Sequence, residues 1–168
     1  MLQLIKINVT NMAENSTNTP EMKYGEREIA EGELITFPNP RPGRRYKVNV
    51  SLPEFTCKCP FSGYPDFATI NISYMPDQSV VELKAIKLYI NSYRDRYISH
   101  EEAVNQILDD FVAACNPLEA TVTGDFSPRG NVHTVVEVHH QQPRVWPFIG
   151  FERVIRYEIV NLAWRQSR

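Results

Sequence analysis

The sequence predicts an α+β fold built on an antiparallel sheet. Segments with strand-like alternation occur in runs on either side of two helical segments, whereas a doubly wound parallel sheet would alternate strand and helix. The chain has 168 residues, of which 42% are hydrophobic and 23% charged, enough for one domain with its own core. We therefore expect a single domain over residues 31–168, preceded by a flexible arm over residues 1–30.

Charge and hydropathy exclude several classes of protein. Lys and Arg number 18 against 20 Asp and Glu, so the net charge of 18 − 20 = −2 gives no electrostatic reason to expect direct nucleic-acid binding. Residues 1–9 are too interrupted by polar side chains for a signal peptide, and no later stretch approaches the ~20 apolar residues that span a bilayer. Three cysteines cannot all pair within the chain. A cytoplasmic protein with free thiols and no membrane contact is expected.

The first part of the chain divides into an arm, two strands and a loop. Residues 10–30 hold few large apolar side chains, so they cannot bury enough area to offset their ordering entropy. Apolar residues alternate over residues 46–50 and again over residues 67–74, where β-branched side chains predict a strand that ends before Pro76. Residues 55–66 are predicted to be the loop between the two strands.

The middle of the chain predicts two helices. Apolar residues from Leu83 fall on one helical face, and this pattern ends near Asp95. Ser99 and Glu102 have the spacing of a capping box, in which each side chain satisfies a free backbone N–H at the start of a helix. Asn116 and the proline after it end this second helix. Three strands are then predicted, over residues 120–126, 132–139 and 151–164.

The predicted loop concentrates residues that can do chemistry. It holds the thiols Cys57 and Cys59 and the carboxylate Asp66, together with two prolines and a glycine. A thiol becomes a nucleophile when its pKa is lowered or when a proton-transfer partner lies beside it, and Asp66 or one of the four histidines could be that partner. The alternative is that both cysteines are small hydrophobic residues of the core.

A zinc site is a weaker interpretation. Its candidate ligands are Cys57, Cys59, His133, His139 and His140. Zinc sites favour cysteine pairs two to four residues apart followed by a second close pair, and the C-x-C spacing lacks this signature. We expect His133 and His139 to lie on a solvated strand face instead.

Three basic residues could bind an anion. Lys84 and Lys87 are three residues apart, so they lie on one side of the first predicted helix, where two cations can hold a phosphate. The alternative is an ordinary solvated helix face. Arg129 adds a cation in a predicted turn.

Two stretches resemble the signature sequences of the QueF family, the NADPH-dependent nitrile reductases of queuosine biosynthesis. They are ELKAIKLY over residues 82–89 and CPFSGYPDFAT over residues 59–69, and the resemblance covers residues 36 to 140. It implies a tunnelling fold (T-fold), in which an antiparallel sheet carries two helices on one side and subunits join into a barrel with active sites at their interfaces. The implied assembly is a homo-oligomer, a decamer of two pentamers. The implied reaction converts 7-cyano-7-deazaguanine to 7-aminomethyl-7-deazaguanine with two NADPH.

The resemblance also assigns roles to individual residues. Cys59 matches the nucleophile that forms a covalent thioimide with the nitrile, Asp66 matches the proton donor, and His100 lies next to the catalytic centre. Cys57 is not part of the motif, and no metal is implied. The substrate-binding positions match Val81, Glu82, Leu83, His100 and Glu101, and the NADPH-binding cations match Lys84, Lys87 and Arg129.

Three other functions compete with this one. A QueF-like amidinotransferase adds ammonia to the nitrile within tRNA and needs no NADPH, but the intact motif over residues 82–89 and the acidic net charge disfavour it. A zinc-dependent GTP cyclohydrolase shares the broad fold, but its metal-ligand pattern is not evident. A non-catalytic purine-binding module would keep Glu101 and have no use for Cys59 and Asp66 at this spacing.

Overall fold

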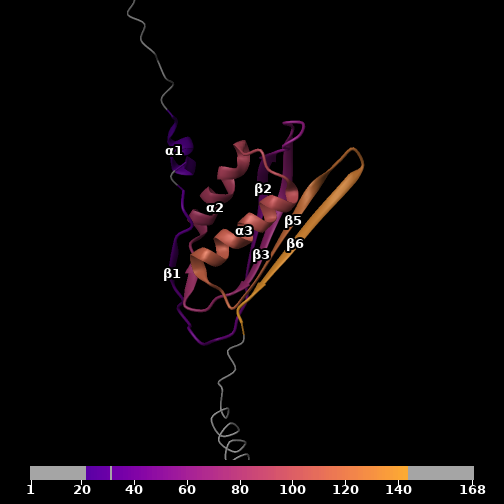
Figure 1. Ribbon diagram of the computed structural model, residues 1–168. Coiled ribbons are helices and arrows are strands. Elements are labelled where there is room, and N and C mark those ends of the chain that lie inside the picture. The colour runs from indigo at the N-terminus through magenta and orange to yellow at the C-terminus, as the bar shows by residue number, and fades with distance from the viewer. Residues whose placement is uncertain (1–21, 31, 144–168) are drawn as a thin grey trace, which may run out of the picture.

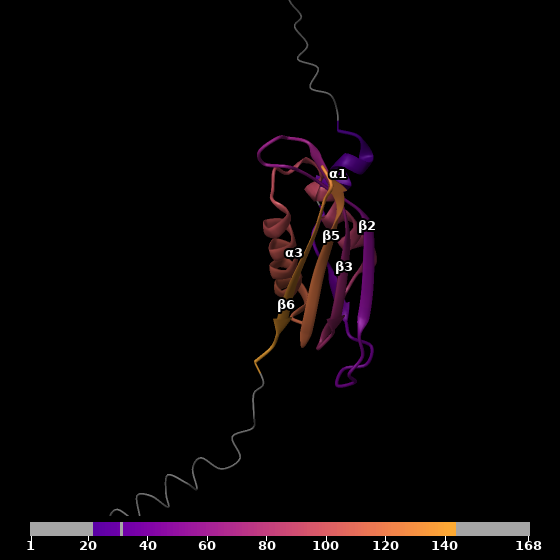
Figure 2. The same ribbon diagram turned by 90° about the vertical axis from the view of Figure 1, so that its right-hand side faces the viewer.

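The computed structural model describes residues 22–30 and 32–143, which form a four-stranded antiparallel sheet with helices on one face (Figures 1 and 2). The strands of this sheet, in spatial order, are β2 (Val48–Lys58), β3 (Pro65–Met75), β5 (Glu119–Arg129) and β6 (Val132–Gln141). A small antiparallel pair joins β1 (Thr36–Pro38) to β4 (Ser79–Val81). The helices are α1 (Tyr24–Ala30), α2 (Leu83–Asn91), the 3-10 helix η1 (Ser92–Asp95) and α3 (His100–Cys115). This arrangement confirms the predicted α+β class with an antiparallel sheet.

Residue alternation along β3 explains why the helices cover only one face of the sheet. Buried side chains recur at every second position of β3, and the residues between them are more exposed. The buried set comprises Asp66, Ala68, Ile70, Ile72 and Tyr74. Because successive side chains of a strand point to opposite faces, one face packs against α2 and α3 and the other stays polar.

A bulge in β2 changes which residues of that strand face the core. Leu52 pairs with Ile70, but Phe55 pairs with Ala68, so β2 holds one extra residue in this interval. Pro53 lies in the bulge, which β2 tolerates because it is an edge strand and needs fewer N–H donors. Before the bulge the even-numbered positions point inward, and after it Phe55 and Cys57 are fully buried. After the bulge, the odd-numbered residues of β2 therefore face the helices, up to the end of the strand next to Cys59.

The helix layer packs closely on the sheet at Gly124. The buried face of α3 consists of Ala103, Val104, Ile107, Leu108, Phe111 and Cys115, at the spacings of three and four residues seen in the sequence. A methyl group added at Gly124 in β5 would lie 2.6 Å from Val104 Cγ2 and 2.9 Å from the ring of Phe126. Only glycine allows α3 to come this near the strand.

Gly124→Ala is therefore expected to destabilise the fold. Overpacking of this kind costs about 1–3 kcal/mol of unfolding free energy, because neither Val104 nor Phe126 can move without disturbing the core. Urea unfolding followed by circular dichroism measures the loss. Gly25→Ala is the matched control, since an added methyl group there has no neighbour within 4 Å. Equal midpoints for the two variants would contradict the packing argument.

Several elements differ from the sequence-based expectation. Residues 24–30 form α1 instead of continuing the flexible arm, and Lys84 of α2 pairs with Glu28 of α1 at 2.8 Å. Strand β2 extends to Lys58 and β3 begins at Pro65, so the predicted loop over residues 55–66 is wrong for its first four and its last two residues. At the end of β2 the bulge had broken the alternation. Strand β1 was not predicted because it is only three residues long. The predicted strand over residues 151–164 and residues 1–21 of the predicted arm lie outside the described residues.

The predicted helices are confirmed, with one correction at a cap. The first continues from α2 through η1 to Asp95, and the second ends at Cys115, where Asn116 adopts a left-handed conformation. Ser99 caps α3 by accepting a hydrogen bond from the N–H of Glu102 at 3.2 Å. Among the described residues, the Glu102 carboxylate does not make the return bond, so only half of the predicted capping box forms.

Candidate functional site

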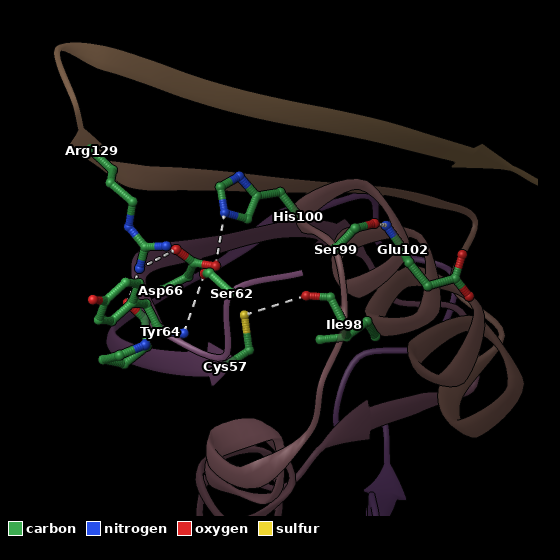
Figure 3. A network of polar contacts seen from close by, with 10 residues as sticks. Cys57, Ser62, Tyr64, Asp66, Ile98, Ser99, His100, Glu102 and Arg129 are labelled. Carbon is green, nitrogen blue, oxygen red and sulfur yellow. Dashed lines mark hydrogen bonds and ion pairs between the residues drawn. The ribbon is translucent and has the colours of Figure 1, made fainter. Parts of the chain in front are cut away.

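Four of the residues predicted to act together meet at a small cavity. The cavity has a volume of about 210 Å³ and is lined by Cys59, Asp66, His100, Ser127, Arg129, Val132 and Thr134. These residues come from the β2–β3 turn, the start of β3, the start of α3 and the hairpin of β5 and β6. Figure 3 shows that the side chains of His100 and Arg129 converge on Asp66 from two sides.

Cys59 lies in a turn that its own backbone closes. The Cys59 N–H donates to the Tyr64 carbonyl at 2.8 Å, and the Cys59 carbonyl accepts from the Gly63 N–H at 2.9 Å. Gly63 has φ +71°, a left-handed conformation that side-chain-bearing residues rarely adopt. The turn thus fixes the backbone on both sides of the thiol.

A second set of backbone hydrogen bonds, between the end of β2 and the segment before α3, places His100 near Cys59. The Lys58 N–H donates to the Arg96 carbonyl at 2.9 Å, and the Ile98 N–H donates to the Lys58 carbonyl at 3.0 Å. The segment between η1 and α3 therefore runs beside the end of β2 and starts α3 next to Cys59. The Ser99 cap then sets His100 as the first residue of that helix.

Asp66 is a buried carboxylate with two ionisable partners. Only 8% of the residue is exposed. Its Oδ1 lies 2.8 Å from Arg129 Nη2, and its Oδ2 lies 3.5 Å from His100 Nε2. The His100 ring stacks on Phe126, with ring centres 3.7 Å apart and planes 11° from parallel. A buried carboxylate beside a histidine and a cysteine can accept and return protons.

The two neighbouring thiols differ strongly in acidity. The pKa of the Cys59 thiol is lowered most by a hydrogen bond with the Ser62 side chain, and then by hydrogen bonds with the backbone N–H groups of Ser62 and Phe61. Partial burial of Cys59 and the negative charge of Asp66 act in the opposite direction and raise this pKa. Burial raises the pKa of Cys57 to about 11. Cys57 is a fully buried member of the core. Because the thiolate is the nucleophilic form, these pKa directions favour Cys59 over Cys57 as a nucleophile.

Ser62→Ala is expected to make Cys59 less reactive at neutral pH. Loss of the hydroxyl removes the largest cause of the lowered pKa, so the Cys59 thiolate forms at higher pH than in the unchanged protein. The pH at which iodoacetamide alkylation of Cys59 reaches half its maximal rate should rise, with the two proteins converging at high pH where both thiols are ionised. Peptide mapping by mass spectrometry separates Cys59 from Cys57.

Ser51→Ala is the matched control for this experiment. Ser51 is an exposed serine of β2 and pairs with Asn71 across the sheet. Its removal should leave the pH profile of Cys59 unchanged. An unshifted profile in Ser62→Ala would show that the backbone N–H groups alone set the acidity of Cys59.

The remaining predicted residues do not line this cavity. Glu82 caps α2, and its two carboxylate oxygens accept from the N–H groups of Lys84 at 2.9 Å and Ala85 at 2.7 Å, which lowers the pKa of Glu82. Lys84 bonds to Glu28, which raises the pKa of Lys84. Val81 is buried, and Leu83, Lys87 and Glu101 are exposed. In Figure 1 the start of α2 lies near β1, away from the turn between β5 and β6.

Three residues that line the cavity were not predicted: Ser127, Val132 and Thr134. Two neighbours of the cavity were also missed, Ser62 beside Cys59 and Phe126 beneath the His100 ring. The pairing of β5 with β6 could have indicated Val132 and Thr134, because Phe126 pairs with Thr134 and Arg129 with Val132. His133 and His139 lie on exposed positions, as predicted, paired with Asp125 at 2.6 Å and Glu137 at 3.2 Å.

The described part of the chain has neither a membrane-spanning helix nor a metal-binding cluster. None of its helices has both the length and the apolar character needed to cross a membrane. It also contains no group of three or more His, Cys, Asp and Glu side chains arranged to hold a metal ion.

An α+β scaffold that presents an acidified thiol beside a buried Asp, a His and an Arg has the arrangement that covalent catalysis by cysteine requires. Residues 65–145 match the family model described as QueF-like protein. The chain is 78% identical over 130 residues to the NADPH-dependent 7-cyano-7-deazaguanine reductase of Acaryochloris marina, covering 77% of this chain and 90% of that protein. It is 75% identical over 136 residues to the protein of the same name from Trichormus variabilis, covering 80% of this chain and 100% of the relative. The chain belongs to the QueF family.

A solved structure agrees with this assignment at the level of the fold. The apo form of the archaeosine synthase QueF-Like has a TM-score of 0.52 to this chain at 26% sequence identity. The similarity covers 59% of this chain and 95% of that structure.

Proposed function

We propose that this chain is a nitrile reductase that converts 7-cyano-7-deazaguanine to 7-aminomethyl-7-deazaguanine with two NADPH, in the biosynthesis of queuosine in tRNA. The observation that carries the proposal is the reactive Cys59 beside buried Asp66 in a chain that is 75–78% identical to proteins of that name. The overall reaction consumes one nitrile, two NADPH and two protons, and it yields one primary amine and two NADP⁺.

Cys59 opens the reaction by adding to the nitrile carbon. A sulfur–carbon bond forms, the carbon–nitrogen triple bond becomes double, and the product is a thioimide. This addition makes a weak hydride acceptor into one that can be protonated and reduced, which divides a difficult step in two. The position of Cys59 supports this step, because Cys59 lines the cavity and its backbone is held by the turn.

Asp66 moves the protons of the reaction. Its carboxylate can take the proton of the Cys59 thiol and return it to the imide nitrogen, and His100 at 3.5 Å is the neighbour that can exchange a proton with it. The stack of His100 on Phe126 keeps the imidazole aimed at Asp66. Because Asp66 is only 8% exposed, water competes little for these protons.

Lys84, Lys87 and Arg129 would bind the phosphates of NADPH, which supplies the hydrides of the reaction when bound. The donor set fits this group, since the three side chains are cationic and Lys87 and Arg129 point at least partly to solvent. Lys84 already pairs with Glu28, so a phosphate would replace that carboxylate as its partner. A basic patch of this kind can select the extra phosphate of NADPH without a glycine-rich fingerprint.

The complete site requires two copies of the chain in this proposal. Val81, Glu82, Leu83 and Lys84 do not line the cavity that holds Cys59. A T-fold barrel, built from sheets that join edge to edge, would bring the start of α2 of one copy to the Cys59 cavity of the next. Strands β2 and β6 are the edges of the sheet within the described residues, and we propose that they make such pairing. We expect a decamer of two pentamers.

The test is NADPH consumption by the purified protein. Absorbance of NADPH should fall only when 7-cyano-7-deazaguanine is present, and NADH should not replace NADPH. Amine formation is confirmed by mass spectrometry at one product per two NADPH. Absence of both NADPH loss and product would overturn the proposal.

An amidinotransferase is the second candidate, because the solved structure that resembles this chain is an archaeosine synthase. Such an enzyme would form the same cysteine adduct and then use ammonia. An adduct visible by intact mass, together with no NADPH oxidation and with conversion of nitrile-bearing tRNA in the presence of ammonium, would favour this candidate.

A further inference from the structure

Arg129 makes contacts that a phosphate-binding residue does not need. One guanidinium nitrogen, Nη2, lies 2.8 Å from Asp66 Oδ1 and also donates to the backbone carbonyl of Pro65. Arg129 Nη2 therefore contacts both the side chain of Asp66 and the backbone of Pro65, the residue before it. This double contact fixes the Asp66 carboxylate relative to its own strand.

The Arg129 guanidinium also lies near the Tyr64 ring, in the turn that carries the proposed nucleophile. Its central carbon lies 5.7 Å from the centre of the Tyr64 ring, in the range of a cation–π contact. Tyr64 in turn accepts the backbone N–H of Cys59 through its carbonyl oxygen. Arg129 thus links Cys59 and Asp66, the two residues that must exchange a proton.

The backbone at Arg129 is itself fixed. Arg129 is the last residue of β5 and pairs with Val132, and the two residues between them, Gly130 and Asn131, have φ +56° and +67°. Two successive positive φ values define the tight hairpin turn that suits the twist of paired strands. The guanidinium is therefore presented to Asp66 from the end of β5, next to a tight hairpin turn. Lys84 and Lys87 line no part of this cavity.

We propose that Arg129 is a positioning residue for Asp66 in formation of the thioimide, before any hydride is transferred. With Oδ1 held by Arg129, Oδ2 is the oxygen left to face His100 and the cavity. In this step the thiol S–H adds across the nitrile: sulfur bonds to carbon, and the thiol proton passes through Asp66 to nitrogen. No electrons enter, so the step needs no NADPH. This inference rests on the proposed function.

The half-reaction without NADPH separates this role from phosphate binding. The Arg129 side chain is 45% exposed, so its remaining nitrogens can also meet a phosphate, and both roles would lower turnover. Only the positioning role affects the rate at which 7-cyano-7-deazaguanine forms the adduct in the absence of cofactor. We would measure that rate by rapid quench and intact mass for the unchanged protein, R129M, R129K and R45M.

R129M is expected to form the thioimide about 10- to 100-fold more slowly at saturating nitrile, because small misplacements of a catalytic group have effects of this size. R129K should recover part of the rate, since its ammonium can reach Asp66 without the second contact. R45M is the matched control: Arg45 pairs with Glu119 at 3.2 Å, at the opposite end of β5 from Arg129. Its rate should not change.

The outcomes distinguish this inference from the proposed function. If R129M forms the adduct at the unchanged rate while its KM for NADPH rises, Arg129 only binds cofactor and the inference is wrong. If the unchanged protein forms no adduct, the proposed function fails before Arg129 is tested. Circular dichroism checks that R129M is folded, and R129K decides the result if R129M is not.

Discussion

Replacing Cys59 by alanine is expected to eliminate both the covalent adduct and turnover. No other described thiol can replace it: Cys57 and Cys115 are buried, and burial raises their pKa values to about 11 and about 12. Removal of a covalent nucleophile leaves only binding and positioning, so turnover should fall by more than about 10³-fold. Intact mass after incubation with 7-cyano-7-deazaguanine measures the adduct, and NADPH absorbance measures turnover.

Cys57→Ala is the matched control for the nucleophile. Cys57 lies two residues from Cys59 and belongs to the core cluster, so its loss is expected to lower stability modestly and to leave the adduct intact. The reverse pattern, with turnover lost in Cys57→Ala and kept in Cys59→Ala, would transfer the role of nucleophile to Cys57.

Asp66→Asn is expected to have the next largest effect. Asparagine keeps the size of the side chain but cannot take the thiol proton or return it to nitrogen. Loss of a general acid–base group lowers rates by about 10²- to 10⁴-fold. Adduct formation without NADPH and complete turnover should both fall, because the proton is needed from the first step onward.

The control for Asp66 is Asp125→Asn, which removes a carboxylate from another Asp–His pair. Asp125 lies 2.6 Å from His133, and both side chains are about half exposed. Its loss should not alter turnover. If Asp66→Asn retains full adduct formation, the thiol proton must leave by another route, and His100 becomes the candidate for the first proton transfer.

Regular alternation and helical spacing were sufficient to predict most of the fold. Strand β3, helices α2 and α3 and the first part of β5 have regular patterns, and the structure agrees with them. The predicted turn at Arg129 was wrong, because β5 continues to Arg129 after a register shift that follows Phe126. Prediction from the sequence failed where a local irregularity interrupted the hydrophobic pattern, or where there was no such pattern. The bulge at Pro53 shifts the buried positions of β2 by one residue, so the end of that strand resembled a loop. Helix α1 is short and buries no side chain, which left no hydrophobic pattern to detect.

The candidate site was only partly predictable, because it depends on pairing between distant segments. Cys59 and Asp66 are near neighbours in sequence, and the turn between them brings them together. The contact between Arg129 and Asp66 spans more than sixty residues and depends on the register of β3 with β5, which no local pattern states. The resemblance assigned Arg129 to the cofactor, and its contact with Asp66 emerged only from the structure.

The turn at Cys59 has a consequence for the temperature dependence of the reaction. Two backbone hydrogen bonds and the left-handed Gly63 hold the backbone of the proposed nucleophile when the chain folds, so the conformational entropy of that backbone is lost then and not during catalysis. The barrier to thiol addition should therefore be mainly enthalpic, with little of it arising from ordering the loop. A nucleophile on a mobile loop would meet that entropic barrier again in every turnover.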